Sequence, residues 1–275
     1  MIRLILAVVL IAVPALSSAQ ERRPSHCIAI AQNTPGLQYL HKASFRAPVP
    51  EFSVRLRYIA HASFLIQSED GLSAVTDFTG FIGNVAFIPD VVTMNHAHTT
   101  HWTPNPDPAI PNVFRGWSEE YGQPADHYVD LGGMVVRNVP TDIRSWDGAR
   151  EPNGNSIFVF EAAGLCIGHL GHLHHEPSDE QYAALGRMDV VMAPVDGGYT
   201  LPLDNMMNVL RRLKARIVIP MHWFADGSLG RFLAGMEEDF DIVETGGSEI
   251  TVSLRDLPDR PTIMVLRPSY LREDE

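Results

Sequence analysis

The sequence predicts an α/β fold in one domain, and three observations support this prediction. The chain has 275 residues, a length that is ordinary for a layered α/β domain. Hydrophobic residues make up 45% and charged residues 20%, as in packed globular proteins. Short strand-like runs dominate the first half, whereas strand and helix patterns alternate in the second half. The sequence contains no internal repeat and no sign of a second domain boundary.

Residues 1–19 have the pattern of a secretory signal peptide. Arg3 carries a positive charge, residues 4–16 are apolar, and Ser17-Ser18-Ala19 are small residues typical of a cleavage site. An uncleaved membrane anchor is the alternative, but a spanning helix needs roughly 20 apolar residues. We therefore predict a signal peptide over residues 1–19, a leader over residues 20–50 and a folded domain over residues 51–275, in a periplasmic or secreted protein.

The acidic balance of the chain limits the partners that it can bind. Lys and Arg number 21 and Asp and Glu number 33, so the net charge is −12 with His neutral. Removal of residues 1–19 takes away one Arg and leaves 20 basic against 33 acidic residues, a net charge of −13. Such a charge disfavours nucleic acids and other polyanions. We expect a small-molecule substrate and no stable membrane insertion after processing, while the oligomeric state stays open.

Two cysteines, Cys27 and Cys166, bear on the compartment of the protein. Their number excludes a four-thiolate metal site, and neither belongs to a Cys-x-x-Cys motif. Export would allow them to pair, because disulfides form in oxidising compartments. Cys166, however, lies in an apolar run that predicts a buried strand. Two unpaired thiols, one of them in the core, are therefore an equal alternative.

The first half of the domain predicts an antiparallel meander followed by a buried strand. Apolar runs predict strands over residues 53–58, 63–67, 72–76 and 90–94. The next stretch, residues 103–126, is rich in Pro, Asn and Gly. It predicts a long loop with a helical turn at residues 114–121.

The second half predicts strands that alternate with helices. Ser178-Asp179-Glu180-Gln181 is a capping box and predicts a helix through Arg187. Residues 203–215 predict another helix, since their apolar residues recur on one face. Strands are predicted over residues 134–139, 156–161, 165–170, 189–193, 216–220, 249–254 and 262–266.

Histidines are concentrated in two short segments. Of the 12 histidines, those in the two segments are His96, His98, His101, His169, His172, His174 and His175. In the first segment, two imidazoles stand two residues apart at the end of a predicted strand, so that both can point one way. Neutral imidazole is a frequent ligand of borderline divalent ions. The first segment therefore predicts a metal site, whereas His174 and His175 fit a cap or a solvent-facing turn.

Several segments resemble the metallo-β-lactamase-fold hydrolases in order and spacing. His96-Ala97-His98-Thr99-Thr100-His101 resembles the His-x-His-x-Asp-His motif of that family. Further segments resemble motifs of its ascorbate-phosphate-lactonase-like branch, at Tyr58–Phe64, Ile167–His172, Pro194–Thr200 and Ile219–Trp223, and Asp77 falls where that branch has its strand-end Asp. The resemblance covers roughly residues 53–225. It implies a four-layer αββα sandwich with the metals at the edge of its two sheets.

The ligand set that the resemblance implies is altered in this chain. Thr100 stands where the family has a metal-binding Asp, and His172 stands where it has the Asp that bridges two metals. The implied ligands that remain are His96, His98, His101 and His222, with His172 as a substitute. Neutral imidazoles offset less of the repulsion between two ions than carboxylates do, so one ion is favoured. Zinc fits such a site best, and iron, manganese, nickel or copper are alternatives.

The same resemblance gives other residues supporting roles. Because a threonine hydroxyl is no general base near neutral pH, Asp142 and Asp196 are the nearest candidates for a proton acceptor. The residues expected to hold or orient the ligands are His61, Asp77, Thr100 and His169. Trp102, Trp146 and Trp223 lie beside the metal motifs or in the loop that lacks the family's further His. They fit either an apolar substrate pocket or the packing of loops onto the scaffold.

These residues predict an exported metal-dependent hydrolase in which a metal-bound hydroxide attacks the carbonyl of a lactone, ester or amide. The sequence contains no G-x-S-x-G elbow, P-loop or dinucleotide fingerprint that would support another enzyme chemistry. The alternative is a catalytically degenerate periplasmic protein that binds a metal or ligand on the same fold. Thr100 favours this alternative, because it removes the family's proton-handling carboxylate.

Overall fold

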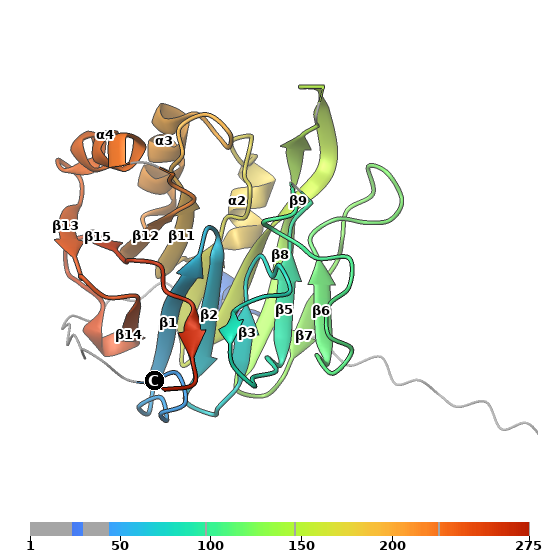
Figure 1. Cartoon of the computed structure of the whole chain (residues 1–275). Helices are drawn as coiled ribbons and strands as arrows, with labels where there is room; N and C mark the ends of the chain where they lie inside the picture. Colours follow the sequence, from blue (N-terminus) through green and yellow to red (C-terminus); the bar gives the residue numbers. More distant parts are fainter. Residues whose placement is uncertain (1–23, 30–43, 97, 146, 225, 275) are drawn as a thin grey trace, which may run out of the picture.

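The computed structural model describes residues 24–29, 44–96, 98–145, 147–224 and 226–274 (Figure 1). The predicted signal peptide lies outside these residues, as do Trp146 and most of the predicted leader. Among the residues described, no helix is both long enough and apolar enough to cross a membrane.

Two sheets form the centre of the molecule (Figure 1). The six-stranded sheet has the order β14-β1-β2-β3-β5-β6. Its strands are β1 Ser53–Ala60, β2 Ser63–Ser68, β3 Ser73–Val75, β5 Val91–Met94, β6 Asn112–Arg115 and β14 Glu249–Ser253. The eight-stranded sheet has the order β13-β15-β12-β11-β10-β9-β8-β7. Its strands are β7 Tyr128–Asp130, β8 Met134–Arg144, β9 Arg150–Ala162, β10 Leu165–His169, β11 Val190–Pro194, β12 Ile217–Met221, β13 Asp241–Glu244 and β15 Thr262–Val265.

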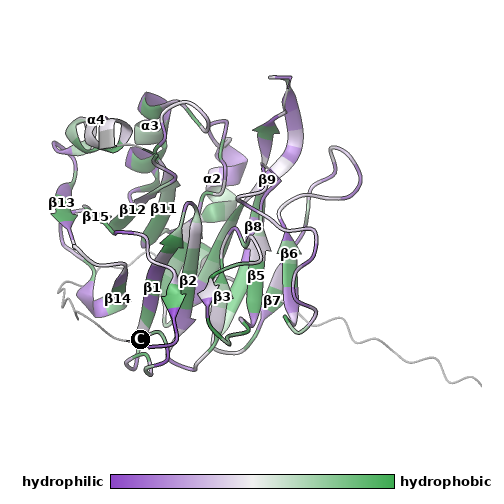
Figure 2. Ribbon diagram, in the orientation of Figure 1, coloured by the Kyte–Doolittle hydropathy of each residue, from purple (hydrophilic) through white to green (hydrophobic). Residues whose placement is uncertain are grey.

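The main core lies between the two sheets, because both turn an apolar face inward. Leu56 and Ile66 of the first sheet belong to the same buried cluster as Phe158, Ile167 and Ile219 of the second. Figure 2 shows hydrophobic residues concentrated along the strands of both sheets. Strands β10, β11 and β12 run parallel to one another, so their carboxyl ends meet at one edge of the sandwich.

Helices cover the outer face of the eight-stranded sheet. They are α2 Asp179–Leu185, α3 Leu203–Leu213 and α4 Asp226–Met236, and a short helix α1, His26–Ala29, precedes the domain (Figure 1). The capping box predicted at the start of α2 is confirmed, since Ser178 and Gln181 each bond to the other's backbone. Leu210 of α3 and Phe232 of α4 pack with Val191 and Val218 of the sheet. The layered α/β sandwich predicted from the sequence is thus confirmed.

The outer face of the six-stranded sheet is covered differently. In the described residues, this layer consists of loops and a small sheet of β4 Gly83–Asn84 and β16 Leu271–Arg272, whereas Leu254 of the 3₁₀ turn Leu254–Asp256 packs against the core between the sheets. Gly83 has φ 137°, and a Cβ at this position would lie 2.1 Å from the carbonyl oxygen of Leu271. Only glycine therefore permits the close pairing of β4 with β16.

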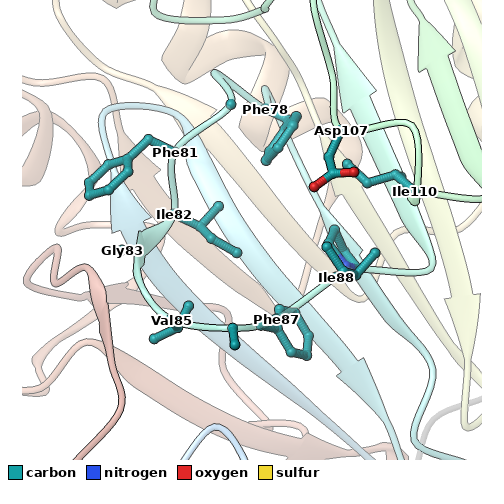
Figure 3. A pocket seen from close by; sticks show the side chains of 12 residues that line it. Phe78, Phe81, Ile82, Gly83, Val85, Phe87, Ile88, Asp107 and Ile110 are labelled. Carbon is teal, nitrogen blue, oxygen red and sulfur yellow. The ribbon is translucent and has the colours of Figure 1, made fainter.

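The same outer layer contains an apolar pocket of about 470 Å³ (Figure 3). Its lining includes Phe78, Ile82 and Phe87 of the loop after β3 and Ile110 of the loop after β5. Asp107 is the one acidic side chain among the lining residues. None of the site residues predicted from the sequence lines this pocket.

One local prediction in the long loop is wrong. Residues 114–121 do not form a helical turn, because Asn112–Arg115 form the edge strand β6, which pairs in parallel with β5. Unpaired backbone groups on β5 would be costly to leave in a nearly buried sheet, and β6 satisfies them. This tertiary hydrogen bonding outweighs the local turn signals.

Cys27 and Cys166 form a disulfide with a Cα–Cα distance of 5.8 Å. The bond joins α1 to the buried strand β10, and the backbone N–H of Arg187 also donates to the carbonyl of Cys27. The two cysteines are 139 residues apart in sequence, so the disulfide closes a long loop of the unfolded chain.

Reduction of this disulfide is expected to lower the free energy of unfolding by about 2–5 kcal/mol. The test is guanidinium unfolding of the mature chain with and without reductant. A Cys27→Ala/Cys166→Ala variant should resemble the reduced protein and should not respond to reductant. The prediction would be contradicted if the wild type and the variant, each with and without reductant, all had the same unfolding midpoint.

Glu161 of β9 is a buried anchor for the N-terminal segment. Its carboxylate bonds to Ser25, lies 3.1 Å from Nδ1 of His26 and accepts from Nε of Arg137 at 2.8 Å. Burial by itself would raise the pKa of Glu161, but the hydrogen bonds from His26, Arg137 and Ser25 outweigh it and lower the pKa to about 2.

The depressed pKa of Glu161 predicts acid sensitivity. The carboxylate contributes stability above its ordinary pKa of 4.5, and this contribution is lost as the pH falls toward about 2. The expected loss is about 1.4 kcal/mol per pH unit in that interval. Urea unfolding between pH 5 and pH 3 should therefore show a smaller loss of stability in Glu161→Gln than in the wild type. The exposed Glu244→Gln serves as the matched control, and equal slopes in all three proteins would refute the prediction.

Candidate metal centre

Four histidines converge at the edge where the parallel strands end. They are His61, His98, His101 and His222, and each offers one ring nitrogen within 4.8 Å of the others. His61 occupies the turn between β1 and β2, His98 and His101 follow β5, and His222 follows β12. The chain topology thus brings together three segments that are distant in sequence.

The backbone of this cluster adopts conformations that are unfavourable for most residues. His61, Asp77 and His222 have φ angles of 52°, 42° and 56°, in the left-handed region. Two hydrogen bonds to the carbonyl of His61 hold this arrangement, from the backbone N–H of His222 at 2.9 Å and from the hydroxyl of Tyr58 at 2.6 Å. Left-handed non-glycine residues concentrate at functional sites, where the surrounding structure compensates the strain.

Asp77 orients His101. Its Oδ2 lies 2.5 Å from Nδ1 of His101, and its Oδ1 accepts from the amide of Asn95 at 2.9 Å. Both side chains of the His101–Asp77 pair are fully buried. With Nδ1 occupied by the carboxylate, Nε2 is the nitrogen of His101 that faces the cluster.

Asp196 orients His222 in the same way. Its Oδ2 lies 2.9 Å from Nδ1 of His222, while its Oδ1 accepts from the backbone N–H groups of Gly198, Tyr199 and Thr200. Burial opposes ionisation of Asp196, but the hydrogen bonds from His222 and Thr200 prevail and lower its pKa. Asp196 is therefore a fixed anion behind His222, whose Nε2 is buried and has no hydrogen-bond partner among the described residues.

Thr100 contacts His98 directly. The threonine hydroxyl oxygen lies 2.8 Å from Nδ1 of His98. Nε2 of His101 lies 3.2 Å from Nε2 of His61. His98, His101 and His222 each have an oxygen partner at Nδ1, so Nε2 is the nitrogen of each that could bind a metal. This is the common arrangement of histidines that bind a metal through Nε2.

His172 lies beside this group. Both of its ring nitrogens are buried and have no hydrogen-bond partner in the part of the chain that the structure describes, and its ring centroid is 4.7–5.1 Å from those of His98, His101 and His222. Gly171 permits this placement, because it has φ 60° and a Cβ there would lie 2.4 Å from the amide of Asn95. Buried imidazole nitrogens are costly when they bond to nothing, so their presence here fits a site built for an ion or ligand.

Burial and the proximity of other rings favour the neutral form of four of these histidines. Burial and the neighbouring His222, His101 and His98 lower the pKa of His61 to about 3. Burial, followed by neighbouring histidines, also lowers the pKa of His98, His101 and His172. Burial raises the pKa of Asp77 to about 6. Neutral imidazole is the form that binds metal ions.

Two residues predicted to belong to the site lie outside the cluster. Nδ1 of His96 is 3.6 Å from a carboxylate oxygen of Glu151, and its ring stacks on Trp117 at 4.9 Å. Asp142 forms an ion pair with Arg150 and accepts from the N–H of Asn153 on the hairpin of β8 and β9. We therefore assign neither His96 nor Asp142 a part in the chemistry proposed below.

The remaining predicted residues support the scaffold. Nε2 of His169 bonds to the carbonyl of Ala62 at 2.8 Å, and its Nδ1 accepts from Gly171. Trp102 packs against the outer core of the first sheet, whereas Trp223 packs against the helix-covered core of the second. Trp102 and Trp223 thus serve different packed layers.

Sequence reasoning missed two aromatic residues at this centre. Phe224 has its ring 5.0 Å from that of His222, and the ring of Tyr199 is 5.7 Å from that of Phe224. Their positions next to His222 and Asp196 in sequence were the available signal. Tryptophan drew attention instead, because it is rarer and larger.

The sandwich and its edge cluster define a layered α/β protein with a histidine-rich metal centre. The chain belongs to the beta-lactamase superfamily, since residues 55–222 match the model of that superfamily's domain. The family predicted from the motifs is confirmed.

Similar proteins have been described in archaea and bacteria. A UPF0173 metal-dependent hydrolase of Nanoarchaeum equitans is 25% identical over 185 residues, which cover 62% of this chain and 84% of that protein. Another from Pyrococcus abyssi is 24% identical over 195 residues, with coverage of 62% and 84%. A solved structure of the metallo-β-lactamase superfamily from Thermotoga maritima has a TM-score of 0.54 and 24% identity, covering 78% of this chain and 98% of its own. This last similarity concerns the fold.

Proposed function

We propose that this chain is an exported metal-dependent hydrolase that binds one zinc ion and hydrolyses the acyl C–O or C–N bond of a lactone, ester or amide. One observation carries the proposal. In His98, His101 and His222, Nδ1 lies beside an oxygen of Thr100, Asp77 or Asp196, and each ring offers a nitrogen within 4.8 Å of those of the others. The archaeal relatives described as metal-dependent hydrolases support the same activity.

The donor set fits zinc. Three neutral imidazoles and one open position are typical of catalytic zinc sites. His61 and His172 lack a carboxylate or hydroxyl partner at the ring, and they flank the three oriented histidines. We assign the three oriented histidines as the ligands, with His61 and His172 beside the open position. Iron, manganese, nickel or copper would also accept these nitrogens.

One ion is favoured over two, because the cluster offers no carboxylate that could bridge a pair. Asp77 and Asp196 are both engaged with the Nδ1 atoms of histidines. A bound divalent ion supplies the Lewis acidity that activates water and polarises a carbonyl. Nε2 of His61 lies 3.2 Å from Nε2 of His101, and both ring nitrogens of His172 are buried, so these two side chains could form hydrogen bonds with a water or a substrate at the site.

Export is supported by the sequence of residues 1–19 and by the Cys27–Cys166 disulfide. Disulfides of this kind persist in oxidising compartments and are rare in the cytosol. Intact-mass analysis of periplasmic protein should give a mature chain that begins at Gln20.

The activity is tested with purified mature protein and a panel of esters, lactones and amides. We expect one zinc per chain after dialysis, turnover of at least one substrate, loss of turnover on chelation and recovery when zinc is added back. Two retained metals per chain would overturn the single-ion assignment. Equal inertness of chelated and zinc-loaded protein toward the whole panel would favour a metal- or ligand-binding protein, which Thr100 in place of the family's Asp also favours.

A further inference from the structure

We infer that Tyr199 and Phe224 form the substrate-binding wall of the metal centre and select substrates with an apolar aryl group on the acyl side of the cleaved bond. This inference rests on the proposed function, since it names the substrate class of the same site. In the cleavage, water adds to the carbonyl, the bond to the leaving group breaks, and the products are an aryl-substituted acid and the protonated leaving group.

Both aromatic rings are exposed on the surface beside the metal centre. Tyr199 is 70% exposed and Phe224 is 60% exposed. Phe224 lies 5.0 Å from the ring of His222 and 5.4 Å from that of His61, and Tyr199 meets Phe224 edge-on at 87°. Single exposed aromatic residues are ordinary on a protein surface, but a pair in contact with two histidines of a metal centre is a typical feature of a binding site.

Hydrogen bonds hold the backbone of Tyr199 in place. Its N–H donates to Oδ1 of Asp196 at 2.6 Å, and its carbonyl accepts from Nε2 of His174 at 2.7 Å. The guanidinium of Arg144 also approaches this carbonyl, at 3.3 Å. The same carboxylate therefore positions both His222 and Tyr199. A preorganised aromatic side chain binds a ligand with a smaller loss of conformational entropy.

The packing of Trp223 leaves Phe224 on the outside of the site. Phe224 directly follows Trp223, whose side chain packs against the helix-covered core and lies 5.8 Å from the guanidinium of Arg267. With Trp223 turned inward, Phe224 is left on the outside beside His222. A planar apolar group can stack or meet these rings edge-on, which favours an aryl group over a small acyl group.

The molecule contains a matched control pair. Phe81 and Tyr270 are 49% and 48% exposed, and their rings are 5.2 Å apart. They lie on the outer layer of the first sheet, where Phe81 lines the apolar pocket of Figure 3. This second pair has the same chemistry as Tyr199 and Phe224 but no histidine among its ring contacts in the described part of the chain.

The test compares ethyl phenylacetate with ethyl acetate, which share one small leaving group. The zinc-loaded mature protein should prefer the phenylacetate ester in kcat/KM. Phe224→Ser and Tyr199→Ser should each reduce this preference by about 10-fold, mainly through KM, with zinc content unchanged. Phe224→Leu should keep most of it, and Phe81→Ser and Tyr270→Ser should keep all of it.

Calorimetric binding of phenylacetate and acetate to the zinc-loaded protein provides a readout without turnover. The inference is supported if the wild type binds phenylacetate more tightly than acetate and Phe224→Ser or Tyr199→Ser loses this difference. This result would support the substrate-binding wall even if the protein hydrolyses no substrate. In that case only the proposed function fails. Equal binding of the two acids, or equal effects of the substitutions in both aromatic pairs, would overturn the inference. If Phe224→Ser loses zinc, Tyr199→Ser and Phe224→Leu decide the question.

Discussion

Replacement of His222 by alanine is expected to remove the metal from the protein and to lower kcat/KM by about 10³-fold or more. His222 directs Nε2 into the cluster from the end of β12, and Asp196 holds its other nitrogen. Without this imidazole, only two of the three oriented nitrogens remain. Two imidazoles hold a divalent ion too weakly to survive dialysis, so elemental analysis of the dialysed variant should show little zinc.

His127→Ala is the matched control for this substitution. The ring of His127 stacks on Phe114 at 4.8 Å and bonds through Nε2 to the carbonyl of Arg115 at 2.6 Å. It has a structural role comparable to that of a buried site histidine, but it is not part of the cluster. The control should lose some stability and keep its zinc. Full zinc content in His222→Ala would show that the ion is bound elsewhere.

Asp196→Asn is expected to weaken zinc binding by about 10–100-fold. An asparagine could keep its oxygen toward the backbone N–H groups of residues 198–200, which would turn its NH₂ group toward Nδ1 of His222. Two donors would then face each other, and the imidazole would relieve this by moving its proton to Nε2. That tautomer cannot bind a metal through Nε2, so affinity falls although every ligand is present.

Competition with a chromogenic chelator measures this effect and separates two roles of Asp196. If the carboxylate is the proton acceptor of the reaction, Asp196→Asn should keep its zinc affinity and lose about 10²–10⁴-fold in kcat. Weaker zinc binding with near-normal kcat at saturating zinc is the result that we expect. Asp142→Asn, which alters only the ion pair with Arg150 and the contact with Asn153 on the hairpin, should change neither quantity.

Local patterns were sufficient for most of the fold. The capping box at Ser178 and the apolar face of residues 203–215 predicted α2 and α3, because a helix start and a helix stripe are set within a few residues. The length of the hairpin of β8 and β9 was not predicted. Its strands continue to Arg144 and from Arg150 through mostly polar residues that pair with each other, and Thr141 and Ile143 of this extension are buried.

The candidate site was predictable in its composition but not in its geometry. The motif around His98 and His101 and the distant His222 were assigned through their resemblance to the motifs of the metallo-β-lactamase-fold hydrolases. His61 could not be assigned in this way. It enters the cluster through a left-handed turn that is stabilised by a hydrogen bond from the backbone of His222, more than 150 residues further along the chain.

The sequence by itself determined the fold family, the concentration of histidines at one sheet edge and the absence of the family's Asp at Thr100. Only the tertiary structure decided which ring nitrogens face a common point and which are already used. Asp77 and Asp196 have become hydrogen-bond partners of histidines, and His96 has turned to Glu151 and Trp117. The physical reason is that a side chain's role depends on which atoms its neighbours occupy, and those neighbours come from strands that meet only in the folded sheets.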